Sequence, residues 1–314
     1  MQDVNRISRA IRELKFCQSW FQMRKNHPLF LFLCGGDDSD PQYVCRREVE
    51  RYVRINSRFK RVLTVKPEIL LNEYAPAIEG INLLELEAII ADLSDAILLF
   101  DESAGSLCEL GAFAMSPPIR RILTACIPER HFGKQTFVIQ GPVRLIEANP
   151  TDLSSVIYLD IECPFSSPGL NDYLEELEEN ARKFHHRKIN RSPDEVDLGS
   201  FTRECLDLIT VFAPLKDYEL LEIYKEYKGF DAFSFKIGTL ESPPRSLSYK
   251  VALAYLASTG LLAYDLAAGT LDMTGEAPGY FMFSPSRRAR IQSIRADLLG
   301  YRRKAHRGIE HVYH

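Results

Sequence analysis

The chain has 314 residues, of which 46% are hydrophobic and 26% charged, and its formal net charge is −4. These values are typical of a soluble globular protein with room for two domains, and they exclude wholesale disorder and a protein that is basic throughout. No apolar run approaches the roughly 20 residues that span a bilayer, and the charged N-terminus lacks the apolar core of a signal peptide, so we expect a cytoplasmic protein. The seven cysteines are scattered without a CxxC pair, which predicts neither disulfides nor a bound metal or cofactor.

An α/β pattern begins after an amphipathic helix that the spacing predicts over residues 1–25. Apolar strand-sized runs alternate with helical patterns over residues 26–165, and this alternation predicts a doubly wound, mostly parallel sheet. The expected order is strand 30–34, helix 41–56, strand 61–66, helix 82–93, strand 96–100, a helix opening at 108, and strand 119–127. In such sheets the ligand lies at the carboxyl ends of the strands, which is where loops 35–38 and 101–106 fall.

Residues 166–200 are charged and rich in turn formers, and we interpret them as a helical linker before a second domain, 201–314. The patterns there predict helices 202–213, 216–228 and 245–258, strand 261–266, loop 267–279, strand 280–284 and a last helix 286–304. Three helices followed by a β-hairpin is the order of a winged helix-turn-helix, in which 245–258 would be the recognition helix.

The sharpest local feature is the stretch 101–114, in which a buried strand leads into a loop of small residues and then a helix. Glu109 is predicted in the first turn of that helix, where the helix dipole favours an ionised carboxylate. An ionised carboxylate at a ligand pocket can attack an anomeric carbon and hold a covalent glycosyl intermediate. The alternative is structural, because Ser106-x-x-Glu109 also has the spacing of a capping box.

Other acidic residues lie close to the same edge of the predicted sheet. Asp101 or Glu102 could hydrogen-bond a sugar hydroxyl or a leaving base, and Asp37 or Asp38 could do so from the first loop. The alternative for each is a solvated loop carboxylate or a turn former. Asp92 and Asp95 flank the start of a strand, at the end of the sheet opposite the predicted site, and we expect structural roles for them.

Four stretches of the α/β region carry a resemblance to a known family. They are LFLCGGD (31–37), LEAIIADLSDAILLF (86–100), ESAGSLCELGAF (102–113) and GPVRL (141–145). These stretches resemble the effector proteins of type II retrons, which are bacterial anti-phage systems. The resemblance implies a nucleoside deoxyribosyltransferase-like domain of the flavodoxin/Rossmann-like type, followed by a winged helix-turn-helix. It also implies a toxic effector that a reverse transcriptase and its multicopy single-stranded DNA (msDNA) hold in check until infection.

The resemblance further implies cleavage of an N-glycosidic bond in NAD or in another nucleotide or nucleoside. The nucleophile of the deoxyribosyltransferases carries over to Glu109. Those enzymes place a sugar-binding Asp six residues before the nucleophile, where this chain has Ser103, which leaves ribosyl substrates such as NAD open. The expected substrate-binding residues are Gly35, Gly36, Asp37, Asp101, Glu102, Ser103, Gly105 and Ser106.

The last predicted helix is strongly basic, which suits contacts with phosphates. The candidate nucleic-acid-binding residues are Arg287, Arg288, Arg290, Arg302, Arg303 and Lys304. Tyr249, Tyr255 and Tyr301 could stack on bases. The alternative is a solvated helix with the tyrosines in the core, and the apolar helix 245–258 suits protein contact at least as well as base reading.

Two other functions remain open at this stage. One is a catalytically inactive nucleotide-sensing module coupled to a winged-helix domain that binds nucleic acid or protein. The other is a winged-helix transcription regulator with a metabolite-binding domain. Because deoxyribosyltransferase-like domains tend to self-associate, the resemblance also implies an assembly in which a neighbouring subunit completes the pocket.

Overall fold

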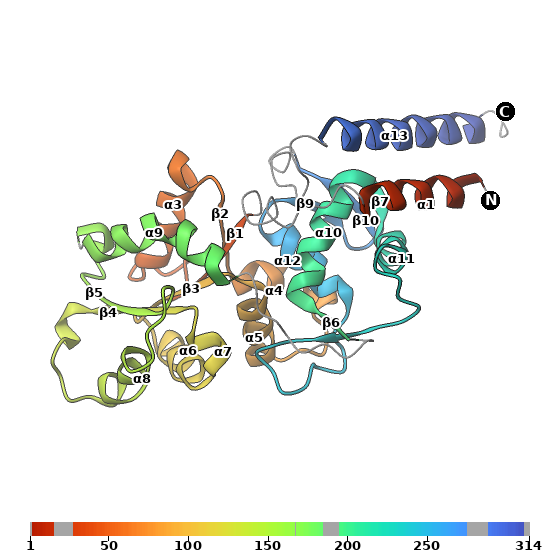
Figure 1. The fold of residues 1–314 in the computed structure, drawn as a ribbon. Coiled ribbons are helices and arrows are strands. Elements are labelled where there is room, and N and C mark those ends of the chain that lie inside the picture. Colours follow the sequence, from red (N-terminus) through yellow and green to blue (C-terminus); the bar gives the residue numbers. More distant parts are fainter. Residues whose placement is uncertain (1, 16–27, 167, 185–194, 275–287, 311–314) are drawn as a thin grey trace.

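The computed structural model describes residues 2–15, 28–166, 168–184, 195–274 and 288–310. A five-stranded parallel sheet organises the N-terminal half (Figure 1). Its strands are β1 (Leu29–Cys34), β2 (Val62–Val65), β3 (Ala96–Phe100), β4 (Leu123–Pro128) and β5 (Ser155–Leu159). They run in the order β2-β1-β3-β4-β5 with every neighbouring pair parallel, which is the flavodoxin-like doubly wound order. The predicted α/β class with a mostly parallel sheet is confirmed.

Helices cover both faces of this sheet, so its central strands are buried from end to end. In Figure 1, α3 and α9 lie on one face, and α6, α7 and α8 lie on the other. The helices are α3 (Cys45–Ile55), α4 (Pro67–Glu73), α5 (Leu83–Leu93), α6 (Ala104–Met115), α7 (Pro117–Arg120), α8 (Arg144–Glu147) and α9 (Pro168–Phe184). Single turns are η1 (Ser57–Phe59), η2 (Ala75–Ala77), η3 (Glu129–His131), the π-turn η4 (Ile139–Val143) and η5 (Pro164–Ser166).

The C-terminal half is built from helices and two small sheets. The helices are α10 (Leu198–Phe212), α11 (Asp217–Lys228), α12 (Tyr249–Ser258) and α13 (Arg288–Glu310). The strands are β6 (Glu195–Asp197), β7 (Leu215–Lys216), β8 (Ser234–Lys236), β9 (Leu262–Asp265) and β10 (Thr270–Met273). Three helices precede the β9–β10 hairpin, as the sequence predicts, and the winged-helix assignment itself stays a prediction.

Several predicted boundaries differ from the structure. The predicted loop 267–279 is wrong in its first part, because β10 occupies 270–273 and pairs with β9. The predicted strand 280–284 lies outside the described residues, as does the second half of the predicted N-terminal helix, whose described part is α1 (Gln2–Lys15). The helix α9, inside the predicted linker, packs on β5. The domain limits therefore stay predictions.

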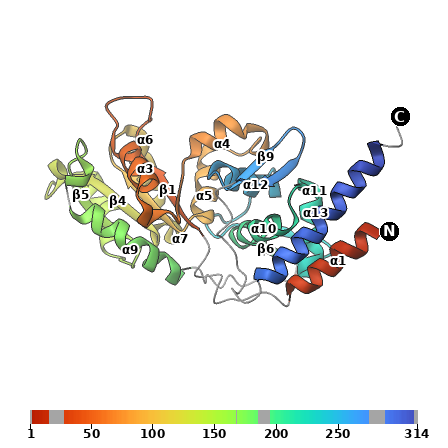
Figure 2. The same ribbon diagram turned by 90° about the horizontal axis from the view of Figure 1, so that it is seen from above.

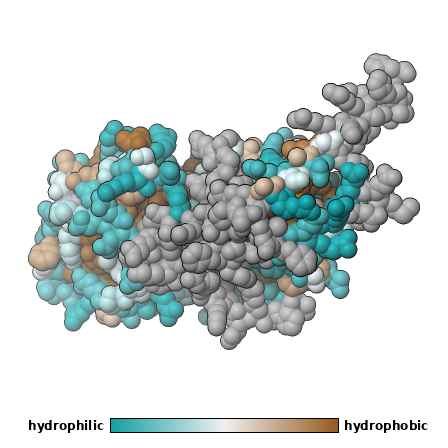
Figure 3. Space-filling view, turned by 45° about the horizontal axis from the view of Figure 1, so that its top comes forward, coloured by the Kyte–Doolittle hydropathy of each residue, from teal (hydrophilic) through white to brown (hydrophobic). Residues whose placement is uncertain are grey.

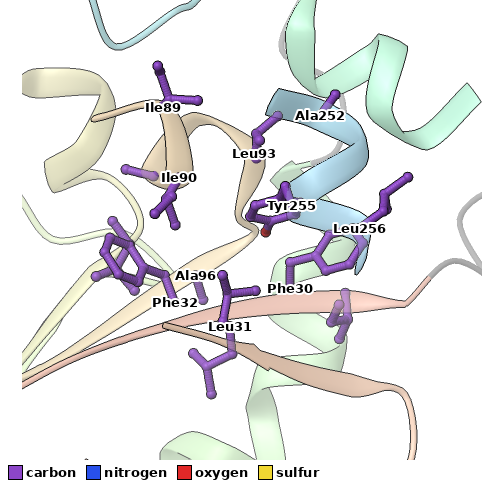
Figure 4. Close-up of a cluster of buried hydrophobic side chains, with 14 of the residues drawn as sticks. Phe30, Leu31, Phe32, Ile89, Ile90, Leu93, Ala96, Ala252, Tyr255 and Leu256 are labelled. Carbon is purple, nitrogen blue, oxygen red and sulfur yellow. The ribbon is translucent and has the colours of Figure 1, made fainter. Parts of the chain in front are cut away.

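The two halves share one hydrophobic core (Figure 4). Tyr255 of α12 is fully buried, stacks edge-on against Phe30 of β1 at 5.3 Å between ring centroids, and hydrogen-bonds Ser94. Arg203 of α10 pairs with Asp95 at 2.7 Å. Asp92 accepts a hydrogen bond from the Gly238 amide, so Asp92 and Asp95 have the structural roles expected of them.

This packing overturns one prediction about the second half. All residues of α12 from 251 to 257 are buried, against α4, α10 and β9. A helix buried in this way has no free face to insert into a DNA groove, so the assignment of 245–258 as the recognition helix is wrong. Tyr255 belongs to the core and is not available to stack on bases.

The terminal helices α1 and α13 lie side by side, with α1 packed on α11 and α13 on α10, and their outer ends extend beyond the rest of the molecule (Figures 1 and 2). Arg290 of α13 pairs with Glu13 of α1 at 2.7 Å, and Arg295 donates to the carbonyl of Thr210 in α10. Elsewhere polar residues predominate on the described surface seen in Figure 3, and hydrophobic residues gather there in small patches.

Candidate active site

Helix α6 begins earlier than the sequence predicts, and this changes the environment of Glu109. Ser103 is the N-cap, and its side chain accepts from the Ser106 amide at 3.0 Å while Ser106 Oγ accepts from the Ser103 amide at 2.9 Å. These two serines form the capping box, so the predicted box of Ser106 with Glu109 is wrong. Glu109 lies in the second turn, not the first, and it does not cap the helix.

The Glu109 carboxylate lies half-buried beneath the carboxyl edge of the sheet. Its Oε2 is buried and has no hydrogen-bond partner among the described residues. Burial raises the pKa of Glu109 to about 7; the charge of Arg46 lowers it, the charge of Glu68 raises it, and a hydrogen bond with Cys34 lowers it. A carboxyl group with a pKa near neutrality and a free oxygen is suited to reaction with a ligand.

A second acidic residue of the site, Glu87 of α5, was not singled out from the sequence. Its side chain is only 5% exposed. Burial, followed by the charges of Glu109 and Glu68, raises the pKa of Glu87 to about 7. Two carboxyl groups that repel each other in a buried site share protons, and the pair holds one charge more readily than two. Burial and mutual repulsion therefore favour a protonated carboxyl group in this pair over a free one.

Arg46, in the first turn of α3, is the buried cation of this cluster. Its side chain is 4% exposed, and it donates to Asp38 at 3.1 Å and to Glu68 at 2.7 Å. Lys66 extends the network with bonds to Asp38 at 2.7 Å and to Glu50 at 2.6 Å. The network fixes the loop after β1 and the start of α4 around the carboxylates.

The glycine loop after β1 is shaped by contacts within the protein. A side chain at Gly36 would collide with the ring of Tyr43, because its Cβ would fall 2.1 Å from that ring. Glu102 Oε1 accepts from the Gly36 amide at 3.2 Å, and Glu102 Oε2 accepts from the Cys45 amide at 3.3 Å. A side chain at Gly35 would meet the same carboxylate at 2.8 Å. Glu102 thus ties the loop to α3.

The remaining predicted substrate-binding residues differ in how far they are exposed. Asp37 is exposed, and the hydrogen bonds from Ser39 lower its pKa. Asp101 is 7% exposed, burial raises its pKa, and the charges of His131 and Arg130 oppose that rise. Gly105 lies exposed in the first turn of α6.

The structure thus brings Glu109 together with residues that the sequence did not reveal. Glu68, Glu87 and Arg46 come from three different helices, α4, α5 and α3. One signal was present in the sequence, because Glu87 interrupts an apolar helical run (LEAIIADL) where a charge is unexpected. Arg46 gave no such signal, since it stands beside another arginine in a charged helix.

The predicted nucleic-acid-binding residues belong to α13 or precede it. Arg290 is the one whose contacts are described, through its ion pair with Glu13. Arg287 lies outside the described residues, and only the backbone is described for Arg288, Arg302, Arg303 and Lys304. A cleft of about 570 Å³ separates α13 from α1, and Arg6 and Arg9 line its α1 side.

Three further features bound the chemistry. The six cysteines within the described ranges carry free thiols. Across the same ranges, His, Cys, Asp and Glu side chains form no group arranged to hold a metal ion. None of the helices in the described part of the chain combines the length and apolarity needed to cross a bilayer.

These features define a class of protein, an α/β fold with a buried and a half-buried carboxyl group, Glu87 and Glu109, near the carboxyl edge of a parallel sheet. A profile of the family described as STM3845 retron effector protein matches residues 42–258. Because this match covers more than half of the chain, the protein belongs to that family of retron effectors.

Two relatives from Escherichia coli agree with this assignment. The chain is 37% identical over 127 residues to the "Retron Ec86 putative ribosyltransferase/DNA-binding protein", and the match spans 40% of each chain. It is 28% identical over 253 residues to the "Retron Ec73 putative ribosyltransferase/DNA-binding protein", across 76% of this chain and 77% of the relative. The predicted relationship to retron effectors is confirmed.

Proposed function

We propose that this retron effector cleaves an N-glycosidic bond, with Glu109 as the nucleophile and Glu87 as the proton-carrying partner. The observation that carries the proposal is the buried Glu109 Oε2, which has no partner within the described residues. A buried acceptor without a hydrogen-bond partner lowers the stability of the fold by roughly 1–3 kcal/mol. Capping the helix does not require such an acceptor. Both relatives are named as putative ribosyltransferases, which supports chemistry at an anomeric carbon.

The proposed reaction has two steps. A carboxylate oxygen of Glu109 bonds to the anomeric carbon while the carbon–nitrogen bond breaks and its electron pair leaves with the base. A neutral purine or pyrimidine leaving group takes a proton from Glu87, whereas the pyridinium of NAD leaves as neutral nicotinamide without one. After release of a purine or pyrimidine Glu87 is already ionised, whereas after NAD cleavage it first loses its proton to solvent, because esterification removes the Glu109 charge that raised its pKa. Water then attacks the glycosyl ester, loses a proton to the ionised Glu87, and releases Glu109. NAD remains the first substrate to test.

The test is a release assay on the purified chain, alone and with its reverse transcriptase and branched DNA. Wild type and Glu109→Gln are incubated with NAD and with a panel of nucleosides and nucleotides, and free base is followed by chromatography. Release by wild type that falls at least about 1,000-fold in the variant is expected for a lost nucleophile. Equal release by both would overturn the proposal.

A second candidate is an inactive nucleotide sensor that uses the same fold. The capping box of Ser103 and Ser106 weakens it, because Glu109 is then not needed to hold the helix. Nucleotide binding without release of any base, unchanged in Glu109→Gln, would favour the sensor.

We also propose that the α1–α13 pair contacts the retron reverse transcriptase and msDNA. The outer ends of both helices extend beyond the body, and three arginines line the cleft between them, together with Glu13 and Asp297. Both relatives are named as DNA-binding proteins, which supports this role. Charge reversal at Arg6 and Arg9 together should weaken binding to the branched DNA and flatten its salt dependence. Unchanged binding would remove α1 from the contact.

A further inference from the structure

The loop after β4 carries an aromatic ring and two cations that the proposed chemistry at Glu109 does not use. It spans residues 129–137, begins at the carboxyl end of β4 and leads into η4, which packs on α6. We propose that this loop is a second subsite, in which Phe132 stacks on a nucleobase and Arg130 and Lys134 contact a phosphate. The proposal rests on the proposed function, because it assigns the ligand as the distal nucleotide of a dinucleotide whose N-glycosidic bond lies at Glu109.

Phe132 is exposed to solvent and yet held in place. Its side chain is 72% exposed, and its ring lies edge-on to that of Tyr158 in β5, with 5.0 Å between the centroids and 89° between the planes. Its amide donates to the Glu129 carbonyl at 3.0 Å, and Gly133 then turns the chain at a φ of +70°. An aromatic ring fixed in this way loses little conformational freedom when a planar ligand stacks on it. Every nucleobase has a face that can do so.

Two permanent cations flank Phe132 in the loop. Arg130 and Lys134 are both exposed, and neither forms an ion pair with a carboxylate in the part of the chain that the structure describes. Glu129 is the one carboxylate within the loop, so its charge is outnumbered. Phosphate oxygens accept hydrogen bonds from both cations, and an arginine can donate to two of these oxygens at once. An exposed ring between two exposed cations therefore suits a base that carries a phosphate.

Contacts along β5 place Phe132 on the same face of the sheet as Glu109. Ile157 of β5 faces α9, because its side chain lies 3.4 Å from where a Cβ at Gly169 would be. Tyr158 is the next residue of the strand and points to the opposite face, where α6 and α8 lie (Figure 1). Phe132 packs on Tyr158, and Glu109 belongs to α6, so both lie on this face near the carboxyl edge. One ligand can therefore contact both.

The separation of the two residues indicates the length of that ligand. Glu109 and Phe113 are four residues apart and lie on one side of α6. Phe113 packs on Phe32 of β1, with 6.0 Å between the ring centroids, so Glu109 lies toward β1. Phe132 lies on β5, three strands further along the sheet, which is roughly 14 Å at about 4.8 Å per strand. A nucleoside bound at Glu109 does not cover this separation, whereas a dinucleotide joined by a diphosphate does.

The experiment measures ligand binding to the full-length Glu109→Gln protein, which leaves the ligands uncleaved. NAD, AMP and nicotinamide riboside are titrated by calorimetry, so that the dinucleotide is compared with its distal and its proximal part. Phe132→Ala in this background should weaken NAD and AMP binding at least about 5-fold, the low end for loss of a base stack, and leave nicotinamide riboside binding unchanged. Phe132→Trp should retain the affinity, and Arg130→Gln with Lys134→Gln should weaken NAD and AMP binding and reduce its salt dependence. Phe137→Ala is the matched control, because that ring is 86% exposed in the same loop, and no change is expected.

The outcomes separate this proposal from the proposed function. Weaker NAD and AMP binding in Phe132→Ala supports it even if the wild-type protein releases no base, in which case only the proposed function fails. Equal NAD affinity with and without Phe132→Ala overturns it, as does an equal loss in Phe137→Ala, even if base release is retained. An effect on AMP without one on NAD also overturns it, because the loop would then bind a separate nucleotide. Failure of the parent protein to bind either NAD or AMP overturns it as well.

Discussion

Carboxylates at the two ends of one parallel sheet have opposite environments in this protein. At the amino end, Asp95 accepts from the Phe30 amide at 2.9 Å and from Arg203 at 2.7 Å. At the carboxyl end, Glu109 and Glu68 each have a buried oxygen without a donor among the described residues. The scaffold is shared, so the difference lies in the donors that surround each group. The ion pair at the amino end therefore serves stability, and the unsatisfied oxygens of Glu109 and Glu68 are what the proposed function assigns to a ligand.

The largest effect on stability should come from removing the ion pair at the amino end of the sheet. Arg203→Met removes the cation that is paired with buried Asp95, and the free energy of unfolding should fall by about 3–5 kcal/mol, the usual cost of an orphaned buried charge. Urea denaturation measures this loss. Arg144→Met is the matched control, because the Arg144 side chain is exposed and bonds Gln140, its neighbour on the same helical turn, so little change is expected. If Arg203→Met lowers the free energy of unfolding by less than about 1 kcal/mol, the stabilising role assigned to the amino end is contradicted.

At the carboxyl end, Glu87→Gln should affect catalysis according to the leaving group. Release of a neutral purine or pyrimidine needs a proton, so its rate should fall roughly 100-fold or more, as for loss of a general acid. The cleavage step of NAD needs none, so the burst of nicotinamide in the first turnover should change little. Rapid-quench kinetics with a nucleoside and with NAD measures the effect of Glu87→Gln on each cleavage step. Equal losses for both would show that Glu87 is not the proton donor.

The contribution of Glu87 to folding stability should fall as the pH rises, whereas the contribution of an ordinary salt-bridged carboxylate rises with pH. The pKa of Glu87 rises from its usual 4.5 to about 7 on folding, so the folded state holds the extra proton between these values and loses stability as the pH rises through them. Glu87→Gln removes this penalty and should stabilise the protein by about 1–2 kcal/mol at pH 8, with little effect at pH 4. Thermal unfolding across pH measures the difference, and destabilisation at pH 8 would contradict the assigned environment.

The smallest effect concerns Ser103, which was predicted to bind substrate. As the N-cap of α6, it should contribute about 1 kcal/mol to stability, and Ser103→Ala should lose that amount. The KM for a cleaved substrate should stay within about twofold, since the hydroxyl bonds Ser106 within the helix cap. A large rise in KM without loss of stability would return Ser103 to the substrate site.

The sequence predicted four of the five strands, because runs such as 29–34 and 96–100 are continuously apolar between turn formers. It missed β5, which is only partly buried, and it began the predicted strand 119–127 too early, inside what the structure shows as α7. It predicted Glu109 at the correct edge, because loops after parallel strands meet there. The start of α6 was wrong because two overlapping boxes compete, one from Ser103 and one from Ser106, and local spacing does not decide between them.

The rest depends on contacts between distant segments. Arg46 and Glu109 are far apart in sequence, and only the folded sheet brings them to one site. Helix α12 shows the same limit in the second half: its position after two helices predicted a recognition helix, whereas packing on α4 and α10 buries it. Burial of Tyr255 against Phe30 follows from how the halves dock, which the pattern within either half does not encode.

The most direct test of the central claim is to trap the covalent intermediate. A 2′-fluoro analogue of the cleaved substrate, beginning with NAD, slows breakdown of a glycosyl ester, because fluorine destabilises the positive charge that develops at the anomeric carbon. Intact mass followed by peptide mapping should find one glycosyl adduct, on Glu109, and none on the Glu109→Gln protein. Base release with no adduct, or an adduct on Glu87 or another residue, would contradict the account.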